Sequence, residues 1–408
     1  MQTSLADFIR DTDVGREADK ILRSCVHCGF CNATCPTYQL LGNELDGPRG
    51  RIYLIKQVLE GHEATAKTLT HLDRCLTCRN CETTCPSGVE YGHLVDIGRR
   101  VVEEQVKRPW LESLQRLGIK HVFSNPTLVT ALLGMGRTVR ALLPAKLRQA
   151  VPVKRDAGQW PAAAHTRKMM VLSGCVQSGA APQINIAAAR ILDRLGISLL
   201  DSPASGCCGA LEFHLNDQSG GLGRARQNID VWNRALDSGV EAIVMTASGC
   251  GSMVKDYAHL LRDDAQYAAK AKRVVDATKD LFEVLAGEPL ETLKETVSGT
   301  APMRPVGYHA PCSLQHAQRL GDVGASVLSR LGFQPLSGQD AHLCCGSAGS
   351  YSLLQPKISG DLRERKVRTL EATDAELIVT ANIGCMMHIQ AGTQVPVRHW
   401  AEAVAARL

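Results

Sequence analysis

The sequence predicts an α plus α/β protein, in which a helical N-terminal domain is followed by two duplicated α/β domains. Two cysteine runs of identical spacing lie before residue 90, and the segment between them has a helical apolar periodicity. After residue 165, apolar strand-like segments alternate with helical stretches, which is typical of an α/β core. The same order of segments then occurs a second time with matching cysteine spacing, which indicates a duplication.

Both cysteine runs have the spacing C-x2-C-x2-C-x3-C-P. Bacterial ferredoxins with two [4Fe-4S] clusters use this spacing, and the fourth cysteine of each run ligates the other cluster. A zinc ribbon would carry cysteine pairs with a long gap between them, and a disulfide framework would suit a secreted protein, so the spacing favours iron–sulfur clusters. The expected ligands are Cys25, Cys28, Cys31 and Cys85 for cluster 1, and Cys75, Cys78, Cys81 and Cys35 for cluster 2.

The segments around these runs are expected to be helical. Residues 16–24 predict a short helix that leads into Cys25, and the apolar residues between Ile52 and Leu59 recur at helical spacing. Arg49 and Arg51 precede that second helix. They could raise the reduction potentials of negatively charged clusters, or they could be solvated charges at a helix end, and the sequence leaves both readings open.

The charge and composition exclude several functions. The net charge is only +5 and aromatic residues make up 4 %, which gives little support for nucleic-acid binding. The first ten residues lack the basic and apolar regions of a signal peptide, and no apolar run approaches the ~20 residues that would cross a bilayer. We therefore expect a reducing, cytoplasmic location for the sixteen cysteines.

A basic segment follows the ferredoxin-like domain. Between Arg99 and Arg155 there are twelve Lys or Arg residues and three Glu residues, and apolar residues give one or two helices a hydrophobic side. Such a segment can lie on an anionic membrane surface, here the inner face of the cytoplasmic membrane, or it can pack on the next domain. Packing is the favoured alternative.

The second part of the chain contains two cysteine-rich repeats. In both, thirty-one residues separate a single cysteine from a Cys-Cys-Gly sequence, and a last cysteine follows the pair after forty-one or thirty-nine residues. Strands are expected at residues 169–172, 243–246, 306–309 and 377–380. The expected domains are residues 1–100 for the helical ferredoxin domain, 101–165 for the basic helical linker, 166–290 for the first cysteine-rich domain and 300–408 for the second.

The combination of these domains resembles heterodisulfide-reductase-like proteins and, within them, the family of glycolate oxidase iron–sulfur subunits. The stretches that carry the resemblance are residues 25–31, 45–54, 71–78 and 380–385, and the similarity runs from about residue 17 to residue 405. The resemblance implies a redox subunit with no catalytic residues of its own. It also implies a partner subunit that oxidises glycolate or another 2-hydroxy acid at FAD, and a quinone-type acceptor.

The sequence agrees with a flavin on a partner subunit. We find no strand-anchored G-x-G-x-x-G sequence, and Gly220, Gly221 and Gly223 are interpreted as part of a helix start.

The cysteine-rich repeats depart from the heterodisulfide-reductase pattern. In that branch each repeat ends in C-x-x-C, whereas here Met253 and His388 stand at the place of the second thiol. Because imidazole is a better metal ligand than a thioether, a further metal, iron–sulfur or zinc, is expected first in the C-terminal repeat. The candidate ligands there are Cys312, Cys344, Cys345, Cys385 and His388.

The first repeat is the weaker candidate for a metal. Its residues are Cys175, Cys207, Cys208 and Cys250, and these could equally be buried, inert thiols. His309 and His316 lie near Cys312 and are either ligands, neighbours of a ligand or ordinary polar residues.

Three alternatives to the main interpretation remain. The first is a heterodisulfide-reductase-like subunit that reduces a disulfide, against which the missing C-x-x-C sequences count. The second is the same electron-transfer role in the oxidation of lactate or glycerol 3-phosphate. The last is a structural assembly subunit whose clusters are not redox-active in turnover.

Overall fold

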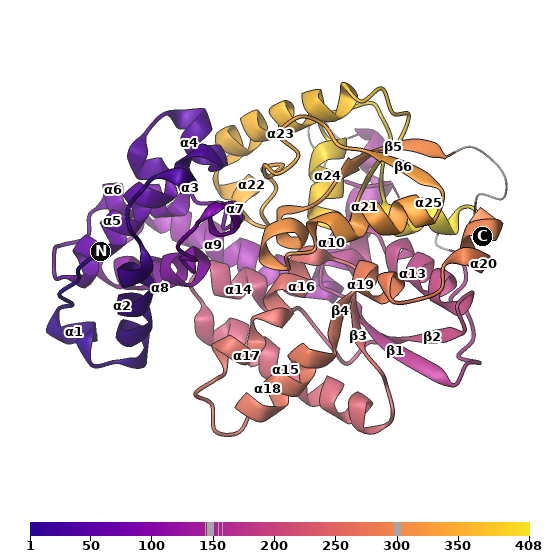
Figure 1. Ribbon diagram of the computed structural model, residues 1–408, viewed down its shortest axis with the longest axis horizontal. Coiled ribbons are helices and arrows are strands. Elements are labelled where there is room, and N and C mark those ends of the chain that lie inside the picture. The colour runs from indigo at the N-terminus through magenta and orange to yellow at the C-terminus, as the bar shows by residue number, and fades with distance from the viewer. Residues whose placement is uncertain (143, 145–150, 154, 157, 298–302) are drawn as a thin grey trace. The chain divides into compact units, whose positions relative to one another are not determined.

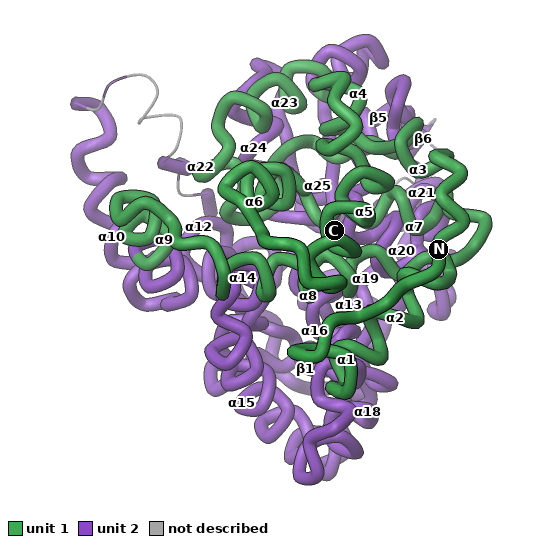
Figure 2. Tube along the Cα trace, turned by 90° about the vertical axis from the view of Figure 1, so that its left-hand side faces the viewer, with its two compact units in different colours: residues 1–117, 342–366 green, residues 118–341, 367–408 purple. Residues whose placement is uncertain are grey.

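The computed structural model describes residues 1–142, 144, 151–153, 155–156, 158–297 and 303–408, and it confirms the predicted α plus α/β fold (Figure 1). The chain forms two compact units, coloured separately in Figure 2. Unit 1 comprises residues 1–117 together with 342–366, and unit 2 comprises residues 118–341 together with 367–408. The expected division into four domains stays a prediction.

The regular elements of unit 1 are all helices, and its described residues contain no strand. The predicted helix at residues 16–24 is part of α2, and the helix around Ile52 is α5, so both predictions are confirmed. The helices are α1 (Asp7–Arg10), α2 (Asp13–Ser24), α3 (Phe30–Ala33), α4 (Pro36–Leu41), the 3-10 helix η1 (Glu44–Asp46), α5 (Pro48–Leu59), α6 (Ala66–Asp73), α7 (Asn80–Thr84), α8 (Tyr91–Gln105), α22 (Tyr351–Leu354), and the greater part of α9 (Trp110–Phe123) and α23 (Pro356–Glu371).

The close approach of α5 and α8 organises the core of this unit. Helix α5 begins with Pro48 at its first position, where a proline costs no hydrogen bond, and buries Ile52 and Ile55. A Cβ atom at Gly98 of α8 would lie 2.5 Å from Cγ1 of Ile55. Only glycine therefore lets the two helices pack at this distance.

Unit 2 contains two four-stranded parallel sheets with the same topology. Their strand orders are β2-β1-β3-β4 and β6-β5-β7-β8, which confirms the duplication. The first sheet consists of β1 (Arg167–Leu172), β2 (Ile197–Ser202), β3 (Ile243–Met245) and β4 (Thr278–Asp280), and the second of β5 (Arg304–His309), β6 (Phe333–Leu336), β7 (Ile378–Thr380) and β8 (Val397–His399). The four strands expected from the sequence are confirmed as β1, β3, β5 and β7.

Helices cover both sheets of unit 2. They are α10 (Pro126–Thr138), the 3-10 helix η2 (Arg140–Leu142), α12 (Gln177–Ala180), α13 (Gln183–Asp193), α14 (Ala210–His214), α15 (Gln218–Asp237), α16 (Ser248–Lys255), α17 (Tyr257–Leu260), α18 (Ala268–Ala277), α19 (Leu281–Ala286), α20 (Glu291–Val297), the π-helical turn η3 (Ser313–Ala317), α21 (Gly321–Arg330), α24 (Ile383–Gln390) and α25 (Trp400–Ala405).

The two repeats share one hydrophobic core. Phe282 of the first repeat stacks on Trp400 of the second, with ring centroids 4.0 Å apart, and both side chains are fully buried. Nε2 of His399 lies 2.8 Å from the backbone oxygen of Thr246, and the N–H of Ser248 donates to the backbone oxygen of Ala381. The duplicated α/β modules are thus packed as one body.

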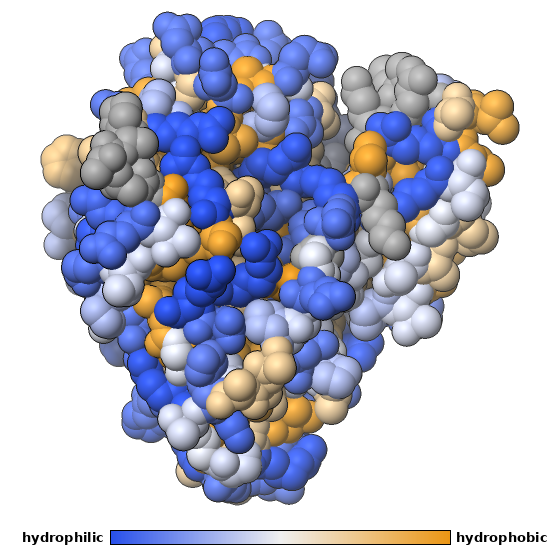
Figure 3. All heavy atoms as spheres, turned by 90° about the vertical axis from the view of Figure 1, so that its right-hand side faces the viewer, coloured by the Kyte–Doolittle hydropathy of each residue, from blue (hydrophilic) through white to orange (hydrophobic). Residues whose placement is uncertain are grey.

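The basic segment is helical in its described part, whereas Lys146, Arg148 and Lys154 lie outside the described residues. Several of its cations are paired within the chain: the buried guanidinium of Arg108 binds the carboxylates of Asp73, Glu103 and Glu112. No helix in the described ranges has the length and apolar character needed to cross a membrane. On the face drawn in Figure 3, hydrophilic and apolar side chains are interspersed.

A buried carboxyl group at the end of β4 makes the stability of unit 2 depend on pH. Oδ1 of Asp280 accepts from the N–H of Phe282 at 2.9 Å and caps α19, and the side chain is only 2 % exposed. Burial raises the pKa of Asp280 to about 7. Because the unfolded group has a pKa of about 3.9, the folded chain binds the extra proton between these two values.

We predict that this proton makes the free energy of unfolding fall as the pH rises from about 4 to about 7, by up to about 1.4 kcal/mol per pH unit. Asp280→Asn keeps a capping oxygen but cannot ionise, so it should remove this slope. Thermal unfolding at pH 5 and pH 8 measures the effect. The variant should gain stability over the original chain mainly at pH 8, and an equal change at both values would contradict the assignment.

Candidate functional site

Four thiols from both cysteine runs meet in unit 1. Cys25, Cys28, Cys31 and Cys85 line one cavity, together with parts of α5 and the Pro86 turn, and Cys81 also lines it. Burial raises the pKa of the Cys31 thiol to about 11, and Cys25, Cys85 and Cys28 are its nearest ionisable neighbours. We call these four residues the first thiol group.

A second thiol group consists of Cys35, Cys75, Cys78 and Cys81. Burial raises the pKa of Cys81, and the neighbouring thiols of Cys78, Cys75 and Cys35 raise it further. Like the first, this group takes three thiols from one run and the fourth from the other. Four converging sulfur donors are the ligand set that a [4Fe-4S] cluster requires, so the residues of both groups fit such a cluster.

The backbone of the two cysteine runs repeats as closely as their sequence. The second residue after the first cysteine is left-handed in both runs, at His27 (φ 59°) and Thr77 (φ 51°). The fourth is left-handed too, at Gly29 (φ 87°) and Arg79 (φ 57°). These turns aim backbone N–H groups at sulfur, as the N–H of Thr77 does at 3.4 Å from Sγ of Cys75.

Polar groups and cations surround Cys75 in the second thiol group. The hydroxyl of Tyr91 donates to its sulfur at 3.6 Å. Burial alone would raise the pKa of Cys75, but the guanidinium groups of Arg51 and Arg99 bring it below its usual value. For Arg51 the sequence left two interpretations open, tuning of a cluster or a solvated charge. The sequence contains no indication of a role for Arg99 and Tyr91, which lie on α8 outside both cysteine runs.

A loop from the C-terminal repeat completes unit 1 beside the second thiol group. Nδ2 of Asn80 donates to the backbone oxygens of Thr34, at 2.9 Å, and His342, at 3.2 Å. The hydroxyl of Tyr351 donates to the backbone oxygen of Arg74 at 3.1 Å. Because Thr34, Arg74 and Asn80 each precede a cysteine of this group, residues 342–351 are fastened directly to the chain that presents its thiols.

The thiols of the first cysteine-rich repeat form a linked series in unit 2. Cys175 follows β1, Cys207 and Cys208 precede α14, and Cys250 lies in the first turn of α16. Hydrogen bonds from the thiols of Cys175 and Cys208 lower the pKa of Cys207, and Cys208 is also linked to Cys250. The sequence made this repeat the weaker metal candidate, yet pairwise interactions link its four thiols.

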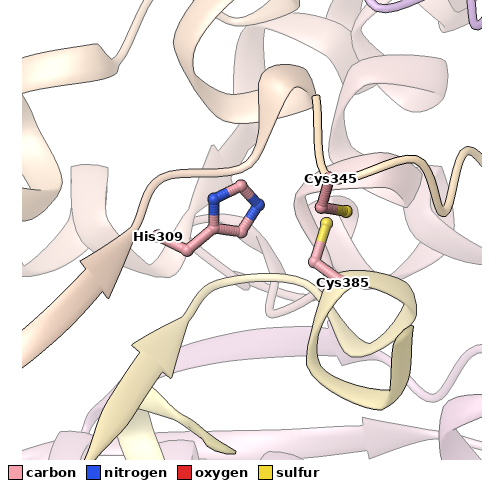
Figure 4. A group of neighbouring side chains, drawn as sticks. All are labelled: His309, Cys345 and Cys385. Atoms are coloured by element: carbon pink, nitrogen blue, oxygen red, sulfur yellow. The ribbon is translucent and has the colours of Figure 1, made fainter. Parts of the chain in front are cut away.

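In the C-terminal repeat, two buried side chains of unit 2 lie close together (Figure 4). His309 at the end of β5 and Cys385 at the start of α24 each offer one ligand atom, and these two atoms lie within 4.8 Å of each other. Among the described residues of unit 2, this pair contains His309 rather than His388. The sequence had named His309 as one possible ligand and His388 as the better one.

The glycines of α15 serve a helix start, as the sequence indicated. The carboxylate of Asp217 caps this helix by accepting from the N–H of Gly220 at 2.9 Å. Gly221 packs against Gly209 and Phe213. These residues therefore do not form a dinucleotide-binding turn.

Comparison with known proteins identifies the same parts. Residues 21–89 match the family model of the 4Fe-4S dicluster domain, and residues 169–255 and 306–390 each match that of the cysteine-rich domain. The chain is 52 % identical to the glycolate oxidase iron-sulfur subunit of Escherichia coli (strain K12), over 100 % of this chain and 99 % of the relative.

More distant relatives extend the comparison. The probable glycolate oxidase iron-sulfur subunit of Bacillus subtilis (strain 168) is 31 % identical over 91 % of this chain and 89 % of its own length. Lactate utilization protein A of Anoxybacillus flavithermus is 27 % identical, over 54 % of this chain and 92 % of its own.

Proposed function

Because the chain belongs to the family of glycolate oxidase iron–sulfur subunits, we propose that it is the electron-transfer subunit of a flavin-dependent glycolate dehydrogenase. A partner subunit oxidises glycolate or another 2-hydroxy acid at FAD, and this chain carries the electrons to a quinone-type acceptor. The observation that carries the proposal is the presence of two separate four-thiol groups in unit 1.

In this proposal each thiol group holds one [4Fe-4S] cluster with a crossed fourth ligand. Cluster 1 takes the first thiol group, including Cys85, and cluster 2 takes the second, including Cys35. The grouping of ionisable neighbours around Cys31 and Cys81 supports this arrangement. When bound, such clusters supply one-electron oxidation and reduction. The chain itself supplies the thiols, the hydrogen bonds to sulfur and the buried cations.

We assign hydride acceptance to the partner rather than to this chain. The glycine-rich start of α15 is capped by Asp217 and packs on Gly209, so it offers no cradle for a pyrophosphate. The substrate therefore follows from the partner. A partner that oxidises lactate or glycerol 3-phosphate would use the same relay, and the lactate-utilisation relatives favour lactate over glycerol 3-phosphate as the second choice.

This assignment of roles is tested on the complex of the chain with its flavoprotein partner. Cys35→Ser should abolish the EPR signal of cluster 2 and retain that of cluster 1, because the fourth ligand is crossed. Glycolate should still bleach the flavin, whereas reduction of a water-soluble quinone should be lost. The flavoprotein alone is the control.

The EPR signals and quinone reduction test two different parts of the proposal. Loss of the cluster 1 signal alone would refute the crossed ligation. Unchanged quinone reduction would remove this chain from the path of the electrons.

A further metal in the cysteine-rich repeats forms a second part of the proposal. In the first repeat the linked thiols of Cys175, Cys207, Cys208 and Cys250 support iron or zinc, since both metals accept four sulfur donors. In the C-terminal repeat the proximity of His309 and Cys385 supports a site with one imidazole, and the remaining candidates are Cys312, Cys344, Cys345 and His388.

Metal analysis of anaerobically purified protein tests the first repeat. We predict that Cys250→Ser lowers the iron or zinc content per chain and leaves both ferredoxin EPR signals in place, because the thiol lies in unit 2. An unchanged metal content would leave the four cysteines as structural thiols. A disulfide-reducing function gains support only if the lost metal is iron.

Peripheral contact with an anionic membrane is the last part of the proposal. Leu128, Leu132 and Met135 on α10 and Val139 at its C-cap recur at helical spacing, and all four are exposed, while Val129 is buried. Positive charges accumulate in this segment of the sequence. An exposed apolar stripe within a basic segment suits the interface of an anionic lipid surface.

We predict that the double variant Leu132→Glu and Met135→Glu weakens co-sedimentation with anionic vesicles by roughly tenfold or more, because two apolar side chains leave the lipid. Leu353→Glu, at another exposed apolar residue, is the matched control. Absent binding of the original chain at low salt, or equal binding by the double variant, would reject membrane contact.

A further inference from the structure

Two arginines are buried beside the second thiol group. The side chain of Arg51, on α5, is 1 % exposed, and Arg99, on α8, is 6 % exposed. A guanidinium remains charged in a protein, so both carry their charge into a region that water does not reach. A buried cation is costly unless it meets negative charge and hydrogen-bond acceptors.

The guanidinium of Arg99 makes hydrogen bonds to the chain segment that contains Cys75. Its Nη2 donates to the backbone oxygens of Cys75, at 2.7 Å, and Leu72, at 3.0 Å, and its Nη1 donates to Oγ1 of Thr77 at 3.0 Å. The N–H of Thr77 in turn points at Sγ of Cys75. The guanidinium is thus fixed against the loop that delivers a hydrogen bond to this sulfur.

Arg51 reaches the same group from the other side. Its Nε donates to the backbone oxygen of His71 at 2.8 Å, and its Nη2 donates to Oγ1 of Thr37 at 3.2 Å. That hydroxyl lies 3.3 Å from Sγ of Cys35. Arg51 therefore reaches Cys35 through Thr37 and also acts on the charge of Cys75, as Arg99 does.

The carboxylates nearby do not cancel these charges. Asp46 is 3.8 Å from Arg51 but also binds Nη1 of Arg74 at 3.0 Å, and Asp96 is 3.9 Å from Arg99. Nδ1 of His71 also contacts Asp46. Asp73, whose charge acts on Arg99, is itself bound by Arg108 and Arg116. Asp46 and Asp73 are thus each shared with further arginines.

The first thiol group is arranged differently. Its side-chain cation Arg49 is one-third exposed and is paired with Oε1 of Glu44 at 2.6 Å. The other cation there is the ammonium group of Met1, which donates to the backbone oxygen of Cys25. Neither side chain of the Arg49–Glu44 pair is shielded from water as Arg51 and Arg99 are.

We propose that Arg51 and Arg99 are positioning residues that raise the reduction potential of cluster 2. The inference rests on the ligation proposed above. Reduction adds one electron and therefore one negative charge to a cluster. Two cations held in a low-dielectric interior stabilise that added charge more than exposed cations do. The two arginines therefore make cluster 2 easier to reduce. Burial alone would make its reduction harder.

The test is an EPR-monitored redox titration of the anaerobically purified full chain, with iron and sulfide content checked for each variant. The cluster 2 signal is the one that Cys35→Ser removes. Arg99→Gln retains donors to the backbone oxygens but loses the charge. It should reduce the ratio of reduced to oxidised cluster 2 at a fixed potential by about tenfold, which is 59 mV for a one-electron couple. Arg99→Lys should retain most of the original value, and cluster 1 should be unaffected.

Two further variants keep the test decisive if Arg99→Gln fails to fold. Asp96→Asn removes the carboxylate next to Arg99, so it should shift cluster 2 in the opposite direction. Arg49→Gln is the matched control at the exposed pair and should leave cluster 2 unchanged.

The possible outcomes separate the inference from the proposed function. A wild-type chain without two cluster signals would refute the ligation itself. Two signals with a cluster 2 potential that neither Arg99→Gln nor Asp96→Asn moves would overturn only the role of the arginines.

Discussion

The burial of thiols that must become anions is the constraint on which unit 1 depends. Cys35, Cys75 and Cys81 are almost fully buried, and close thiolates in a medium of low dielectric repel one another. Apolar packing cannot compensate for that charge. The close approach of α5 and α8 at Gly98 compensates for the negative charge of the thiolates, because it brings Arg51 and Arg99 close to the sulfur atoms. The packing of the helices in unit 1 therefore also determines where its buried positive charges lie.

In unit 2 the two duplicated repeats have kept the same fold, while the residues at their candidate sites have diverged. Both sheets have the same strand order and share one apolar core around Phe282 and Trp400. The side chains at the ends of the strands differ: the first repeat links four thiols, whereas the C-terminal repeat brings His309 next to Cys385. Such divergence is possible because residues at strand ends contribute little to the shared core.

Local patterns explain what the sequence could predict. The cysteine runs fix both their own turns and their ligand type, since a few residues of chain determine the geometry. Strands β1, β3, β5 and β7 are short apolar runs next to cysteines, and each was predicted. Strands β2, β4, β6 and β8 were missed. β4 (Thr278–Asp280) and β8 (Val397–His399) contain mostly polar or charged residues instead of an apolar run. β2 and β6 follow a helix so closely that their apolar residues, such as Ile197 and Phe333, resemble its continuation.

The roles of Arg99, Asn80 and Tyr351 depend on pairings between distant segments, and residue spacing carries no sign of them. The same holds for the approach of His309 to Cys385, which only the parallel pairing of β5 with β7 creates. Arg51 shows the intermediate case. Because Arg51 is near a cysteine run in the sequence, an effect of its charge on the cluster potential could be suggested. Only the structure shows that Arg51 is buried, whereas Arg49 is exposed.

The fastening of residues 342–351 to Thr34, Arg74 and Asn80 also bears on the order of synthesis. The ribosome makes all eight ferredoxin cysteines within the first 85 residues, yet the last part of unit 1 emerges only after residue 366. During the interval the second thiol group lacks the side of its enclosure that Tyr351 fixes. The hydrogen bonds that tie His342 and Tyr351 to the chain of this group therefore form only after the C-terminal repeat has been synthesised in large part.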